Sequence, residues 1–160
     1  MKRHLPSLFT LINLFMGFLS ILNTQIGNYE IACYYILIAA AFDSVDGKLA
    51  RAIGISSNFG KEIDSLADMV SFCLAPSVLI YNLYTQNMPG ISGEMIASVP
   101  LILGAIRLAR FNVDTEETSS AYFTGLPTPI NAISISSLVI FIQHVNVLNP
   151  EYSQPRLLLP

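Results

Sequence analysis

Charged side chains are scarce in this sequence. They make up 12% of the 160 residues, whereas hydrophobic residues make up 52%, and the mean hydropathy is +0.56. An ordinary soluble domain carries about 25% charged residues, which keep its large exposed surface in solution. The composition therefore argues against a small soluble domain and indicates a protein embedded in a membrane.

Basic residues and cysteines are also few. The net charge is −3, so the basic surface typical of nucleic-acid binding is missing and we expect no nucleic-acid partner. Cys33 and Cys73 each lie in an apolar run. They form neither a disulfide framework nor a CxxC metal site, and we expect them to pack as small apolar side chains. No small-residue cleavage site follows the first apolar stretch, which favours a retained membrane helix over a signal peptide.

Long apolar runs, in contrast, are abundant. A membrane-spanning helix needs about 20 largely apolar residues, and turns rich in glycine, serine, asparagine and proline separate several such runs. We expect an all-α membrane bundle that forms a single domain over residues 1–160. The chain ends at RLLLP, where a further apolar segment can begin, so either the number of spans is odd or the sequence is truncated at its C-terminus. The five predicted spans are 6–22, 29–52, 59–84, 91–112 and 129–147.

Lys and Arg alternate between the two ends of these predicted spans. The connections at 23–30 and 85–94 contain neither residue, whereas the other ends do. Because cytoplasmic loops carry the excess of Lys and Arg, we expect the N-terminus and the 43–68 region to face the cytoplasm, in the cytoplasmic membrane. The basic residues that set this orientation are Lys2, Arg3, Lys48, Arg51, Lys61, Arg107 and Arg110.

Four aspartates gather around the junction of the second and third predicted spans. Asp43 and Asp46 are three residues apart, and Asp64 and Asp68 are four apart, so each pair shares one helix face. A short turn makes the two helices antiparallel neighbours, and the four carboxylates then converge at the cytoplasmic end. Acids inside membrane segments are costly and usually functional. Mg²⁺ or Mn²⁺, two ions in all, would offset their repulsion and suit phosphoryl displacement; the alternative is that the acids are simply solvated at helix ends.

Small residues lie beside these acids. Gly47 and Ala50 would leave a slot for a flat base or ribose, and Gly60 would let helix backbones approach closely. Arg51 suits a phosphate group, because its planar guanidinium binds such oxygens with two hydrogen bonds.

The stretch 43–68 resembles the signature of the CDP-alcohol phosphotransferases, D-x-x-D-G-x-x-A-R-x8-G-x3-D-x3-D, at every fixed position. The resemblance implies a bundle of six core spans, often homodimeric, which uses divalent metal. It implies that Asp68 is the general base that accepts the proton of the acceptor hydroxyl. It also implies a metal site and a CDP-lipid pocket, with Arg51 near the diphosphate. The implied metal ligands are Asp43, Asp46, Asp64 and Asp68; the implied CDP-lipid-binding residues are Asp46, Gly47, Ala50, Arg51 and Gly60.

Further segments bear on the acceptor alcohol. HLPSLFTLINLFMGFLSI near the start, SLADMVSFCLAPS at 65–77, RLARFNV at 107–113 and FTGLPTP at 123–129 resemble the membrane-type phosphatidylserine synthases of bacteria and archaea. Arg107 and Arg110 would hold the serine carboxylate; their alternative role is positive-inside anchoring. Asn13 would contact serine or, alternatively, form an interhelical hydrogen bond. His144 is predicted to lie on the far side of the membrane.

The leading hypothesis is therefore transfer of the phosphatidyl group from CDP-diacylglycerol to L-serine. Glycerol 3-phosphate and inositol phosphate are the alternative acceptors, although their phosphate calls for a larger basic pocket than two arginines provide. A cation transporter predicts acids at the bilayer midplane and internal repeats, and the sequence shows neither. A non-catalytic scaffold is disfavoured because none of the four aspartates is missing.

Overall fold

The computed structural model describes residues 8–53, 58–117 and 128–148, and every regular element among them is helical. This confirms the predicted all-α class. Two segments are π-helices, which have about one more residue per turn than an α-helix. The elements are α1 (Leu8–Gln25), α2 (Tyr29–Ile53), α3 (Asn58–Asp68), η1 (Met69–Leu74), α4 (Ala75–Ile80), η2 (Tyr81–Thr85), α5 (Ser92–Glu117) and α6 (Thr128–Leu148).

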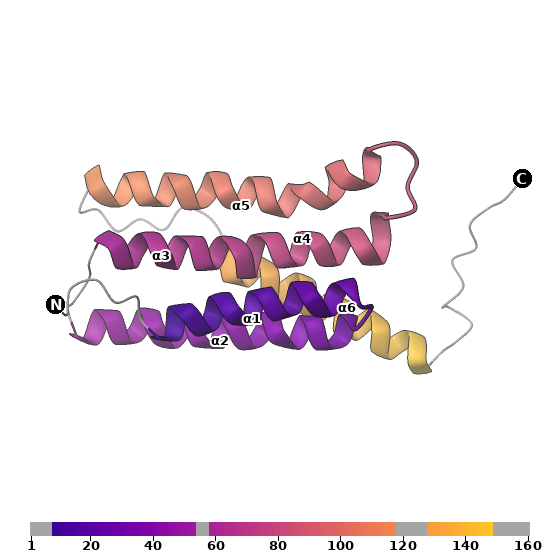
Figure 1. Cartoon of the computed structure of the whole chain (residues 1–160), viewed down its shortest axis with the longest axis horizontal. Coiled ribbons are helices and arrows are strands. Elements are labelled where there is room, and N and C mark those ends of the chain that lie inside the picture. The colour runs from indigo at the N-terminus through magenta and orange to yellow at the C-terminus, as the bar shows by residue number, and fades with distance from the viewer. Residues whose placement is uncertain (1–7, 54–57, 118–127, 149–160) are drawn as a thin grey trace, which may run out of the picture.

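The helices lie roughly parallel to one long axis (Figure 1). α1 and α2 pack side by side as an antiparallel pair, and α3, η1, α4 and η2 follow one another as a single rod over residues 58–85. This rod packs against α1 on one side and α5 on the other, while α6 packs against α2 and η1. The α2–α3 junction therefore lies at the opposite end of the bundle from the α1–α2 and η2–α5 turns.

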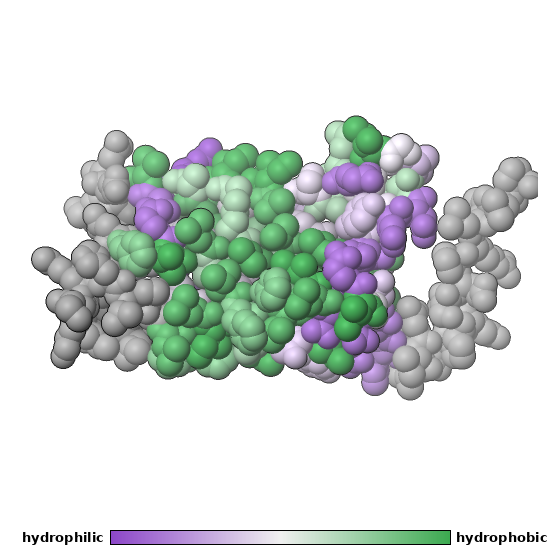
Figure 2. Space-filling model, viewed as in Figure 1, coloured by the Kyte–Doolittle hydropathy of each residue, from purple (hydrophilic) through white to green (hydrophobic). Residues whose placement is uncertain are grey.

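Four of these helical stretches are long and apolar enough to cross a membrane: Leu8–Gln25, Phe59–Thr85, Ser92–Val113 and Thr128–Val145. Hydrophobic residues cover the middle of the bundle in Figure 2, and hydrophilic residues gather at the end with the α1–α2 turn. The predicted span at 29–52 forms as α2, but α2 is not among the four, so its role as a fifth span stays a prediction. α5 continues to Glu117 instead of ending at 112, because no glycine or proline interrupts residues 113–117.

The faces of α1 are reversed relative to a helix of a soluble protein. Its buried residues are small or polar, while large apolar side chains such as Phe15, 54% exposed, and Phe18, 50% exposed, point outward. Lipid tails are as apolar as these side chains, so helix association in a membrane depends on close packing and interhelical hydrogen bonds. The buried stripe is Thr10, Asn13, Gly17, Ser20 and Thr24.

Glycines on α1 and α5 allow the 58–85 rod to lie very close to its neighbours. A Cβ added at Gly17 would meet the backbone and side chain of Ser71, and one added at Gly104 would meet Cys73. The sequence suggested Gly60 for this kind of contact, which stays a prediction. Both cysteines are buried and unpaired, as predicted.

The rod departs from α-helical geometry at two turns, and Pro76 accounts for the first. Pro76 has no backbone N–H and its ring would collide with the carbonyl four residues earlier in an α-helix. The preceding turn is the π-helix η1, where the Ala75 N–H bonds to the Val70 carbonyl. In η2 the Gln86 N–H bonds to the Tyr81 carbonyl, and the Asn82 amide donates to the Val78 carbonyl at 2.9 Å.

Candidate active site

Three of the four predicted aspartates converge. One carboxylate oxygen from each of Asp43, Asp64 and Asp68 lies within 4.8 Å of the others. Asp43 comes from α2, and Asp64 and Asp68 come from successive turns of α3. The side chain of Asp46 lies outside the described residues, so its place in the cluster stays a prediction.

The donor set fits a divalent cation. Carboxylate oxygens are the ligands that Mg²⁺ and Mn²⁺ prefer in proteins. Asp43 and Asp64 are half-buried and Asp68 is 9% exposed, so water screens their mutual repulsion only in part. Two or more positive charges among these oxygens would offset that repulsion, and Asp43 and Asp64 are partly exposed.

Asp68 is the most buried of the three acids. Its Oδ1 accepts a hydrogen bond from Asn13 Nδ2 at 3.2 Å. Asp43, Asp64 and the guanidinium of Arg107 all lie close enough to act on its charge. The carboxylate therefore has a fixed donor on one side, two like charges, and a cation from α5.

The residues predicted to bind the acceptor lie in different environments. Arg107 is half-buried near Asp68 and Cys73, whereas Arg110, one turn later on α5, is exposed. Asn13 makes the interhelical hydrogen bond that was its alternative role, and its partner is Asp68 itself. Direct contact of any of the three with an acceptor stays a prediction.

The predicted CDP-lipid pocket is described only in part. Gly47 is exposed, and a Cβ added there would meet no atom within 4 Å among the residues whose side chains the structure describes. Gly60 is half-buried in the first turn of α3. The side chains of Asp46, Ala50 and Arg51 lie outside the described residues.

Sequence reasoning missed two polar contacts near the aspartates. Ser65 Oγ donates to Asn112 Oδ1 at 3.1 Å and ties α3 to α5. Ser71 Oγ donates to the Asn13 carbonyl at 2.9 Å and ties η1 to α1. The available signal was a polar residue within an apolar run, which in a membrane helix usually has a partner on another helix.

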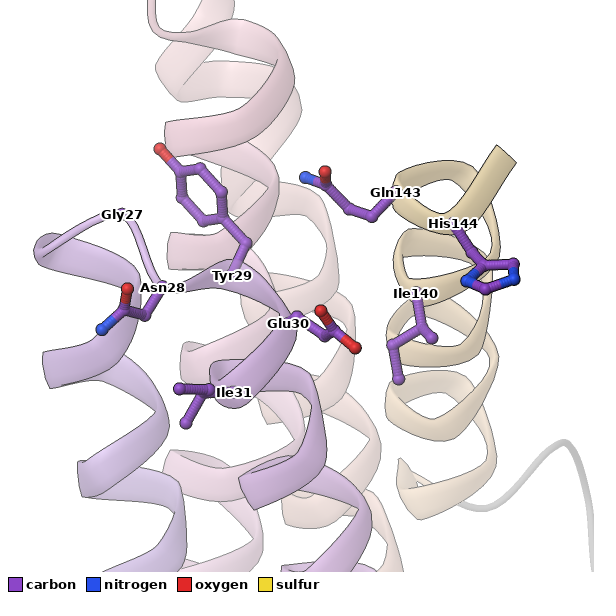
Figure 3. Close-up of a pocket in the computed structure, with 8 residues that line it drawn as sticks. All are labelled: Gly27, Asn28, Tyr29, Glu30, Ile31, Ile140, Gln143 and His144. Atoms are coloured by element: carbon purple, nitrogen blue, oxygen red, sulfur yellow. The ribbon is translucent and has the colours of Figure 1, made fainter. Parts of the chain in front are cut away.

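A separate cavity of about 330 Å³ lies at the opposite end of the bundle. It is formed by the α1–α2 turn, the start of α2 and the last turns of α6, and Figure 3 shows Glu30 and Gln143 on its two sides. His144 lines this cavity, so it is far from the aspartates, as predicted.

The chain is similar in sequence to known proteins. A family model described as CDP-alcohol phosphatidyltransferase matches residues 3–154. The CDP-diacylglycerol–serine O-phosphatidyltransferase of Helicobacter pylori strain J99 is 37% identical over 135 residues, which cover 84% of this chain and 56% of that protein. The archaetidylserine synthase of Methanothermobacter thermautotrophicus is 39% identical over 138 residues, covering 85% and 58%. The CDP-diacylglycerol–serine O-phosphatidyltransferase of Bacillus subtilis is 34% identical over 126 residues, covering 79% and 70%. The chain thus spans a little over half the length of the first two relatives.

Proposed function

Since the chain belongs to the CDP-alcohol phosphatidyltransferase family, we propose that it transfers the phosphatidyl group of CDP-diacylglycerol to the hydroxyl of L-serine, which yields phosphatidylserine and CMP. The choice of serine is supported by the names of the relatives, which include serine phosphatidyltransferases and an archaetidylserine synthase. The observation that carries the proposal is the convergence of Asp43, Asp64 and Asp68 at one end of the bundle.

These acids, together with Asp46, are proposed to hold Mg²⁺ or Mn²⁺, two ions in all. Bound there, divalent ions offset negative charge on the diphosphate and on the leaving CMP. The protein's own part is to hold the acids on two packed helices, so that little reorganisation is needed when the substrate arrives.

Asp68 is proposed as the general base. The serine oxygen forms a bond to the phosphorus that carries diacylglycerol, the bond from that phosphorus to CMP breaks, and the hydroxyl proton passes to the Asp68 carboxylate. Asp68 suits this role because it is nearly buried, which keeps bulk water from competing for the proton.

The two substrates are proposed to bind beside different helices. Gly47, Ala50, Arg51 and Gly60 would line the CDP pocket, and the exposure of Gly47 supports this. On the acceptor side, Arg107 is better placed than Arg110 to pair with the serine carboxylate, since it is half-buried and near Asp68.

The setting of the reaction is also proposed. The aspartate end carries the exposed Lys48, Lys61 and Arg110, which favours the cytoplasmic side of the cytoplasmic membrane. We further propose a homodimer, as the family resemblance implies.

The test is CMP release by the purified protein in detergent with CDP-diacylglycerol and Mg²⁺ or Mn²⁺. Labelled L-serine, glycerol 3-phosphate and inositol phosphate are the acceptors. Asp68→Asn should lose activity, while Glu62→Gln, the same kind of change at an exposed position of α3, should keep it. CMP release with another acceptor but not with serine would overturn the choice of serine as the acceptor. No release with any acceptor, or full activity of Asp68→Asn, would overturn the proposed function.

A further inference from the structure

Asn13 is an unusual residue to bury in the middle of an apolar helix. Its side chain is 0% exposed. Its Nδ2 donates to Asp68 Oδ1 at 3.2 Å, but its Oδ1 has no hydrogen-bond partner among the described residues. Leaving a buried carbonyl oxygen unpaired costs free energy, and an apolar side chain of similar size would avoid that cost. Packing therefore gives no reason for an asparagine here.

The orientation of the Asn13 amide follows from its neighbour. If the amide were reversed, its oxygen would face the Asp68 carboxylate oxygen, and two acceptors would repel each other. With the nitrogen toward Asp68, the amide makes a hydrogen bond to an acid, which is stronger than one between neutral groups. The Oδ1 atom is left unpaired as a result.

The backbone at Asn13 is also fixed. Ser71, three residues after Asp68, donates its hydroxyl to the Asn13 carbonyl at 2.9 Å. Gly17, one turn after Asn13, leaves room for Ser71 to come this close. Asn13 thus donates one hydrogen bond to the Asp68 side chain and accepts another from the Ser71 hydroxyl. Both bonds connect it to the 58–85 rod, which carries the acid.

We propose that Asn13 is a positioning residue that fixes the plane of the Asp68 carboxylate. The torsion that turns a carboxylate is broad and has no sharp preferred value, so a donor bound to one oxygen decides where the other one points. This inference rests on the proposed function of Asp68 as metal ligand and base. It replaces a direct contact of Asn13 with serine, because the Asn13 side chain is fully buried and its amide N–H already bonds to Asp68.

The experiment compares Asn13→Leu with Ser20→Ala. Leucine has the same number of side-chain heavy atoms as asparagine, branched at the same carbon, and it removes the donor. Ser20 lies on the same buried stripe of α1, is 0% exposed, and its hydroxyl has no partner among the described residues, so Ser20→Ala controls for a change inside α1. Mn²⁺ binding to the substrate-free protein is followed by electron paramagnetic resonance. The kcat and the KM for serine and CDP-diacylglycerol are measured beside it, with thermal unfolding in detergent as the check on folding.

Hydrogen-bond partners of metal ligands typically contribute about 10–100-fold to metal affinity or activity. We expect Asn13→Leu to weaken Mn²⁺ binding and lower kcat within that range, with both KM values within about twofold of wild type. Ser20→Ala should match wild type in all four quantities. A raised KM for serine with unchanged Mn²⁺ affinity would overturn positioning in favour of direct contact. Unchanged Mn²⁺ affinity, kcat and KM for serine together would overturn both.

Two further arms keep the outcome clear. If Asn13→Leu does not fold, Ser71→Ala carries the test, since it removes only the hydroxyl that holds the Asn13 carbonyl. It should weaken Mn²⁺ binding in the same direction, and wild-type Mn²⁺ affinity would overturn the inference. If the wild type releases no CMP, the proposed function has failed, but the Mn²⁺ titration still decides whether Asn13 orients Asp68.

Discussion

Replacing Gly17 with alanine would force α1 and η1 apart at one point. The added methyl carbon would lie 2.7 Å from Ser71 Cα and 2.9 Å from Ser71 Cβ, whereas ordinary contacts begin at 3.4 Å. The obstacle includes backbone and cannot rotate away, so the two helices must separate by about 0.7 Å. Inserting a methyl group into a packed interior typically costs about 1–3 kcal/mol of folding free energy.

The same separation of α1 from η1 would also move Asn13 away from Asp68. The hydrogen bond from Asn13 Nδ2 to Asp68 Oδ1 is already 3.2 Å long. A further 0.7 Å would take it beyond hydrogen-bonding distance. Because small misplacements of reacting groups are costly, we expect kcat for serine-dependent CMP release to fall about 10–100-fold.

Gly93→Ala is the matched control. An added Cβ at Gly93 would also meet backbone, at the Thr85 carbonyl, but in the first turn of α5 at the far end of the bundle. Both variants should lower the midpoint of thermal unfolding in detergent, and only Gly17→Ala should lose most of its kcat. Wild-type kcat in Gly17→Ala, or an equal loss in Gly93→Ala, would contradict a link from the Gly17 contact to Asp68.

Three further predictions concern the aspartates, the metal and the arginines. Asp64→Asn should bind Mn²⁺ at least about 10-fold more weakly than wild type by electron paramagnetic resonance. Excess EDTA should abolish CMP release by the wild type, and Mg²⁺ or Mn²⁺ should restore it; activity that survives chelation would rule out a metal-dependent site. Arg107→Ala should raise the KM for serine about 10-fold or more, the usual loss for a charged hydrogen bond, while Arg110→Ala should change it less than about twofold because that side chain is exposed. If both changes raise the KM for serine equally in steady-state assays, the half-buried position of Arg107 does not make it the residue that binds the serine carboxylate.

The course of the helices could be predicted because lipid imposes a simple rule on sequence. Apolar runs of sufficient length end where polar residues, glycine or proline appear, and the observed α2 and α6 begin within a residue of the predicted starts. The convergence of Asp64 and Asp68 followed from their spacing of four residues, which places both on one helix face. Asp43 joined them because only a short connection separates α2 from α3.

Contacts between helices distant in sequence could not be predicted in this way. Periodicity shows which residues of a helix share a face but not which residue of another helix they meet, so the pairing of Asn13 with Asp68, 55 residues away, had no local signal. The contact between Gly17 and Ser71 was missed for the same reason. The π-helical turns had a partial signal in Pro76, but the sequence alone does not distinguish a kink from a widened turn.

The reversed faces of α1 allow its outer surface to be redesigned independently of the site. Leu11, Phe15 and Phe18 point outward, whereas Asn13 is fully enclosed. Polar substitutions confined to such outward positions would leave the small-residue seam and the aspartate cluster unchanged. Redesign of α1 in this way would be a first step toward a water-soluble analogue, in which the acids could be titrated without detergent.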